Sequence, residues 1–206
     1  MLRTFSDNNL LTLLLLLVIT LLAVAKLLDY KRFLDYFKVL INSTYLNTYG
    51  KDIKWFDTFN FLLFLSYCIS LSVFIVGLNF RPDLSIYNVL IGVFLFYGLK
   101  IIIELTLGRL LGAFKSFKLF LFRKLSYKYF MVFFLVPLSA LLLFSNILTP
   151  NSIITILVII IVIHVLTYFI VVSTYLDVVK HNPFYFILYI CTLEIAPYFI
   201  LYKHIM

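Results

Sequence analysis

The chain has 206 residues, of which 64% are hydrophobic and 13% are charged, and its mean hydropathy is +1.11. A typical soluble domain is about 45–50% apolar and about 25% charged, so this composition excludes a water-soluble globule. The net charge of +8 does not indicate nucleic-acid binding, because the basic residues collect between apolar runs, as they do in membrane proteins. We therefore expect a single membrane domain over residues 1–206 and no nucleic-acid partner.

The first apolar run covers residues 10–28. A helix needs about 20 residues to span the hydrocarbon core of a bilayer, and this run has that length. A signal peptide would have a shorter apolar core and a small-residue cleavage site. The run therefore predicts a retained transmembrane helix.

Residues 30–55 alternate between charged and apolar side chains. The apolar residues that recur here at helical spacing are Phe33, Leu34, Phe37, Leu40 and Ile41. This periodicity predicts an amphipathic helix at the level of the lipid headgroups, where Lys and Arg complement anionic lipid. A plain cytoplasmic connector is the alternative interpretation.

The rest of the chain holds five more apolar runs and one more basic, aromatic segment. The expected spans are residues 59–78, 86–107, 130–148, 153–176 and 184–202, and residues 114–129 are expected to form a second interfacial helix or a re-entrant segment. The fold class is therefore all-α: a polytopic transmembrane helical bundle of about six spanning helices with one or two interfacial amphipathic helices.

The basic residues lie mainly after the first, third and fifth runs, whereas the opposite side holds Arg3, Arg81 and Lys203. The positive-inside rule places the basic connections in the cytoplasm. An even number of crossings then puts both termini on the periplasmic side. This parity depends on all six runs crossing the membrane.

Four ionisable residues lie within the expected spans. Lys100 and Glu104 are four residues apart, so they share a helix face and could form an ion pair within the helix. From the rise of a helix, Glu194 lies about 15 Å deep, Lys100 about 21 Å from the outer edge and His164 about 18 Å from it. In a core about 30 Å thick, Lys100, His164 and Glu194 fall in one layer.

Three interpretations of this layer stay open. It is a structural polar network that sets helix register, a proton- or ion-responsive cluster, or a set of unrelated groups that face lipid or extend toward the interface. Cys68 and Cys191 lie inside apolar runs and are expected to pack as small hydrophobes. No cysteine or histidine spacing indicates a metal site, so we expect neither a metal nor a cofactor.

Two further patterns concern helix shape and packing. Pro197 removes one helical N–H and frees the carbonyl of Leu193 beside Glu194, which either forms a binding site or is an ordinary membrane-helix proline. The segment Gly108-Arg109-Leu-Leu-Gly112 has the small-xxx-small spacing that lets helices approach closely. No catalytic motif is present. A lone Glu and His could serve as base and acid, but no spacing supports an enzyme.

The C-terminal segment contains the motif Leu-Tyr-x-Cys-Thr-Leu-Glu-Ile-x-Pro, which ends at Pro197. This motif, with segments 31–33, 59–64 and 100–112, resembles an uncharacterised family of integral membrane proteins found in Bacteroidota. The resemblance implies a bacterial inner-membrane protein with no assigned reaction. The matched positions that it carries over are Lys100, Glu104, Arg109, Glu194 and Pro197.

The leading hypothesis is a structural or accessory subunit of a bacterial envelope complex, with secretion or motility machinery as the associated setting. Its expected partners are membrane lipids and either other membrane subunits or further copies of itself. The second hypothesis is a small proton- or ion-coupled transporter or channel that uses Glu194 and His164. A lipid-active membrane enzyme is a weaker third.

Overall fold

The computed structural model describes residues 5–39, 44–50, 57–78, 85–110, 114–144 and 150–173. Across these ranges the chain forms helices and no strand, which confirms the all-α prediction for the described part. The helices are α1 (Phe5–Leu28), α2 (Tyr30–Phe37), α3 (Thr44–Tyr49), α4 (Thr58–Gly77), α5 (Ile86–Leu110), α6 (Phe114–Phe130), α7 (Val132–Phe144) and α8 (Pro150–Ser173).

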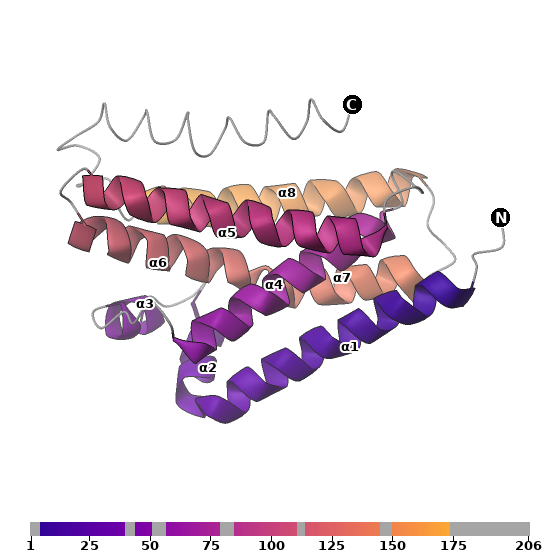
Figure 1. The fold of residues 1–206 in the computed structure, drawn as a ribbon, viewed down its shortest axis with the longest axis horizontal. Helices are drawn as coiled ribbons and strands as arrows, with labels where there is room; N and C mark the ends of the chain where they lie inside the picture. Colours follow the sequence, from indigo (N-terminus) through magenta and orange to yellow (C-terminus); the bar gives the residue numbers. More distant parts are fainter. Residues whose placement is uncertain are drawn as a thin grey trace.

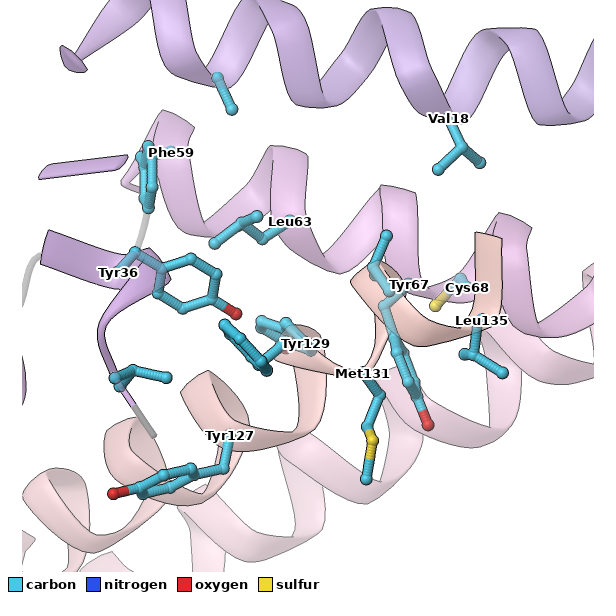
Figure 2. Packing of buried hydrophobic residues seen from close by; sticks show 14 of the residues in the cluster. Val18, Tyr36, Phe59, Leu63, Tyr67, Cys68, Tyr127, Tyr129, Met131 and Leu135 are labelled. Carbon is cyan, nitrogen blue, oxygen red and sulfur yellow. The ribbon is translucent and has the colours of Figure 1, made fainter. Parts of the chain in front are cut away.

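Helix α4 lies at the centre of the bundle and contacts α1, α5, α6 and α7. Helices α5, α7 and α8 run nearly along one axis, and α1 and α4 cross it obliquely (Figure 1). The core is built where these helices meet: Val18 of α1, Leu63 and Tyr67 of α4 and Leu135 of α7 are buried in one cluster (Figure 2). Cys68 is buried in the same cluster, as expected for a thiol that packs as a small hydrophobe.

Four helical stretches are long and apolar enough to cross a membrane: Asn9–Leu28, Thr58–Gly77, Ile86–Thr106 and Lys118–Phe144. The first three match the expected spans 10–28, 59–78 and 86–107 closely. Helix α8 contains a shorter apolar stretch, Ile154–Thr167. The expected span 184–202 lies outside the described residues, so the total of about six spans stays a prediction.

The structure breaks residues 114–144 close to the expected boundary, since α6 ends at Phe130 and α7 begins at Val132, but the two parts belong to one apolar stretch. Helices α6 and α7 meet at Met131. Backbone hydrogen bonds from Met131 N to Lys128 O (3.1 Å) and from Phe134 N to Met131 O (3.0 Å) connect the end of α6 to the start of α7. Residues 114–136 contain no glycine or proline that would end a helix. A single apolar stretch, Lys118–Phe144, therefore takes the place of the expected interfacial segment followed by a span.

The helix ends gather at two opposite ends of the bundle. The end of α1, the short helices α2 and α3, the start of α4 and the end of α5 lie at one end, and the end of α7 and the start of α8 lie at the other (Figure 1). The first of these ends carries Lys26, Lys31 and Arg109. The structure thus gathers basic residues from separate segments at one end. Which compartment that end faces stays a prediction.

Two short helices, α2 and α3, take the place of a single amphipathic helix within residues 30–55. Asp29 begins α2 by accepting a hydrogen bond from the backbone N of Arg32 at 3.0 Å, the usual role of an N-cap aspartate. Tyr36 points into the bundle (Figure 2) and its hydroxyl donates to the carbonyl of Ser126 at 2.8 Å. The sequence pattern assigned Phe33, Leu34 and Phe37 to the apolar face of an interfacial helix. Of these, Leu34 and Phe37 are exposed.

Arg32 fastens α2 to the start of α4. Its guanidinium forms an ion pair with Asp57, which also caps α4 by accepting from the backbone N of Phe59. The guanidinium carbon lies 4.7 Å from the centroid of the Phe59 ring and 4.9 Å from that of Tyr49. Cation–π contacts of this kind strengthen as they are desolvated. Arg32 therefore joins α2, α3 and α4 through charge and ring contacts together.

Burial also sets the ionisation of the groups around Arg32. Burial raises the pKa of Tyr45 to about 12, although Arg32 partly opposes the shift, and burial raises the pKa of Tyr36 well above its usual value. Both hydroxyls are therefore neutral near pH 7. Burial by itself would lower the pKa of Arg32, but Tyr45 and Asp57 outweigh it and raise that pKa. Arg32 is therefore charged in its aromatic surroundings.

Candidate functional site

The site begins with the orientation of α5, which buries Lys100 and Glu104 and exposes many of its large apolar side chains. Lys100 and Glu104 are the buried side chains among those that the structure describes on this helix. Its exposed large apolar side chains are Tyr87, Ile91, Phe94, Leu95, Leu99, Ile102 and Ile103. Lipid tails are as apolar as leucine, so helices in a bilayer associate through close packing and interhelical polar contacts rather than through the hydrophobic effect. The packing of α5 follows this rule.

The inward face of α5 is one helical stripe. Val93, Tyr97, Lys100 and Glu104 are spaced by four, three and four residues, so they lie one above another on the helix. Val93 and Tyr97 pack against the core. The sequence prediction that Lys100 and Glu104 share a face agrees with this placement, and both are directed into the bundle.

Glu104 forms a buried ion pair with Lys124 of α6. The Lys124 Nζ lies 2.5 Å from the Glu104 Oε1, and the two side chains are 7% and 1% exposed. Removing one partner from such a pair leaves an uncompensated buried charge, which costs about 3–5 kcal/mol. The pair therefore fixes the position of Glu104 along α5 relative to that of Lys124 along α6; we call such a position along the helix axes a level.

Lys100 and Lys128 occupy the next level of the same interface. Helices α5 and α6 run antiparallel (Figure 1) and pack together, so a step of four residues from Glu104 to Lys100 matches the step from Lys124 to Lys128. This step is about 6 Å along the axis. Lys100 and Lys128 are also buried, at 7% and 8% exposure. The Lys128 Nζ lies 4.0 Å from the centroid of the Tyr97 ring, a cation–π contact.

Tyrosines connect this cluster to the central helix. The Tyr67 hydroxyl of α4 donates to the Tyr97 hydroxyl of α5 at 3.2 Å, and their rings meet edge to face at 5.3 Å between centroids. Tyr129 of α6 packs against Tyr67 at 5.9 Å. We name Tyr67, Tyr97, Lys100, Glu104, Lys124 and Lys128 the α5–α6 polar cluster.

Other predicted site residues have different positions. His164 lies half-buried on α8, and its carbonyl accepts from the Thr167 hydroxyl at 2.9 Å. Helix α8 packs against α6, so His164 and Lys124 stand on neighbouring helices. Arg109 is exposed in the last turn of α5, beside Gly108.

Glu194, Pro197 and Gly112 lie outside the described residues. The layer that we expect around Glu194, the kink at Pro197 and the small-xxx-small contact that starts at Gly108 therefore stay predictions. Within the described part, the structure places Lys100 and Glu104 on one buried face and pairs the carboxylate with Lys124, a residue outside the predicted set.

Sequence reasoning missed Lys124 and Lys128, because residues 114–129 were expected at the membrane surface. The two lysines are four residues apart, the same step that separates Lys100 from Glu104. A matched step of charged residues in two consecutive helices was the available signal. Among the described residues, no group of histidine, cysteine and carboxylate side chains could hold a metal ion.

The family described as "Domain of unknown function (DUF4271)" matches residues 11–205, so the chain belongs to this family. No curated protein and no solved structure matches the chain. The family match agrees with the expectation of an uncharacterised family. The four apolar helical stretches are compatible with an integral membrane protein.

Proposed function

We propose that this DUF4271 member is a structural or accessory subunit of an envelope complex in a bacterial inner membrane. In this proposal the basic end of the bundle faces the cytoplasm, and the Bacteroidota origin implied by the C-terminal motif gives the setting of secretion or motility machinery. The observation that carries the proposal is the buried Glu104–Lys124 pair. In this pair, the Glu104 carboxylate of α5 contacts a lysine of the same chain inside the bundle.

A charged group that moves ions needs access to water or to a relay of titratable groups. Glu104 is 1% exposed and lies 2.5 Å from an ammonium group, which supports a fixed contact between helices over a mobile carrier. Buried ionic groups are retained in some proteins because they specify one helix register. A subunit that presents fixed faces to its neighbours requires such a register.

A second candidate function is proton or ion coupling. The observation that favours it is the Tyr67–Tyr97 hydroxyl contact beside Lys128, because hydroxyl and ammonium groups in sequence can pass a proton. In this candidate, His164 and Glu194 would extend the α5–α6 polar cluster to the layer expected from the sequence.

Photocrosslinking from the outer face of α5 tests the subunit proposal. A photoreactive amino acid at Leu95 or Leu99, both exposed, is expected to give an adduct with one defined protein at each site in intact cells. The same protein, or a second copy of this chain, should then purify with it in fixed stoichiometry in mild detergent. The matched control is Val18, which is fully buried and should give no intermolecular adduct.

Transport is tested in parallel with the purified chain in proteoliposomes. Adducts with lipid alone, together with a proton flux that Glu104→Gln or Glu194→Gln abolishes, would contradict the subunit proposal and support the second candidate. A protein adduct with no flux supports the subunit. The two assays are independent, so each can fail separately.

A further inference from the structure

The elbow between α1 and α2, which we define as residues 26–38, is a second surface with its own chemistry. We propose that this elbow binds the headgroups of anionic phospholipids in the leaflet on which α2 lies. This inference is separate from the subunit role, since it assigns a ligand class to a surface that contains no residue of the α5–α6 polar cluster.

The elbow exposes several large apolar side chains beside its lysines. Its exposed apolar side chains are Leu27, Leu28, Tyr30, Leu34 and Phe37, and Leu27 is 84% exposed. The three on α2 are spaced by four and three residues, so they form one stripe along the helix. Such a stripe on a short helix beside a bilayer lies in the boundary between headgroups and acyl chains.

Lysines flank this stripe. Lys31 and Lys38 are exposed and seven residues apart, so they stand on the same side of α2. Lys26 is exposed as well, and its Nζ lies 5.8 Å from the centroid of the Tyr30 ring. The three ammonium groups therefore stand beside the apolar stripe, where they can meet lipid phosphates while the stripe enters the acyl region.

The remaining charged groups of the elbow are turned toward the protein. Asp29 caps α2, Asp35 interacts with Tyr49 of α3, and Arg32 is held by Asp57 and its rings. The acidic groups of the elbow thus serve internal contacts. The outward face is left with cationic charge.

Charge complementarity selects the occupant. An ammonium group is a compact point charge that binds phosphate without a fixed geometry. Three ammonium groups beside an exposed apolar stripe match an anionic phospholipid such as phosphatidylglycerol, which has a negative headgroup and apolar tails. A zwitterionic headgroup lacks the net negative charge. A soluble polyanion would meet the lysines but leave the five apolar side chains exposed.

Native mass spectrometry of the full chain tests the proposal by counting phosphatidylglycerol and phosphatidylcholine molecules retained after mild detergent extraction. Each lysine near an anionic surface contributes a factor of about five, so Lys31→Gln with Lys38→Gln should weaken phosphatidylglycerol retention about 25-fold. Phosphatidylcholine retention should stay unchanged. Lys31→Arg with Lys38→Arg keeps the charge and should stay within about twofold of the wild type.

Leu34→Ser with Phe37→Ser tests the apolar stripe and should weaken retention of both lipids. The lysine variants change exposed side chains, so their thermal unfolding should match the wild type, which separates lipid loss from misfolding. Phe37 also contacts the ring of Phe133, with 4.7 Å between the centroids, so the lipid retention of the serine variant is compared at a temperature at which its own unfolding curve shows it to be folded. Equal retention of the two lipids by the wild type, or phosphatidylglycerol retention that survives both glutamine substitutions, would overturn the proposal. So would a stoichiometric protein partner that the glutamine variant loses while it keeps its lipid.

Discussion

Glu104 is the residue on which the arrangement of α5 depends most. It is the most buried carboxylate among the described residues, and its ion pair with Lys124 joins α5 to α6. A group of this kind is tolerated in hydrocarbon surroundings because its partner is fixed beside it. The free energy of the fold should therefore respond to the pair more strongly than to either residue's volume.

Glu104→Gln keeps the shape of the side chain but leaves Lys124 charged and buried. We expect the free energy of unfolding to fall by about 3–5 kcal/mol, whereas Glu104→Gln combined with Lys124→Met should recover much of that loss. Unfolding of the detergent-solubilised protein in sodium dodecyl sulfate measures both. Thr106→Val, an exposed change on the same helix, is the control. Additive losses in the double variant would show that the pair does not couple the helices.

How much of this site could be predicted from the sequence depends on distance along the chain. Lys100 and Glu104 lie four residues apart, so helical periodicity alone placed them on one face. Lys124 lies twenty residues beyond Glu104, and its pairing depends on the register between α5 and α6. That register follows from packing across the whole bundle, which a local pattern does not contain.

At the scale of single elements, α2 is the clearest case of partial prediction. Its apolar periodicity indicated an interfacial helix, and the exposed stripe of Leu34 and Phe37 agrees with that placement. The pattern gave no reason to single out Tyr36, because an aromatic hydroxyl serves equally at an interface or in a core. Its burial depends on the Ser126 carbonyl of α6, ninety residues away.

The two neighbouring basic residues of α2 should behave in opposite ways. Arg32→Gln removes the ion pair to Asp57 and the ring contacts, so we expect α2 and α3 to detach from α4 and the segment 38–57 to be cleaved at least tenfold faster in limited proteolysis. Lys31→Gln makes the same charge change on an exposed side chain and should leave the cleavage rate unchanged. Equal rates in the two variants would mean that Arg32 does not fasten α2.

At the scale of the whole molecule, the charge pattern and the helix ends agree without settling the side. The end of α1, the helix α2 and the end of α5, which carry Lys26, Lys31 and Arg109, lie at one end of the bundle (Figure 1). The division expected at residue 130 coincides with the break between α6 and α7 at Met131. The pattern did not anticipate that residues from Lys118 onward belong to one apolar stretch, Lys118–Phe144, because lysines in a sequence look alike whether they face water or a buried carboxylate. The number of membrane crossings can be measured from the side of the membrane on which chosen residues lie.

Cysteine labelling of intact spheroplasts gives that measurement. The background carries alanine in place of Cys68 and Cys191. In it, Lys38→Cys and Arg109→Cys should react with a membrane-impermeant maleimide only after the spheroplasts are lysed, because the positive-inside rule places the basic end in the cytoplasm. Ser85→Cys, at the start of α5 and exposed, should react in intact spheroplasts. A reporter fused after residue 206 should lie on the same side as Ser85, since six crossings return the chain to its starting side. A reporter on the side of Lys38 would mean an odd number of crossings, and the layer expected around Glu194 would then lose the depth argument that placed it.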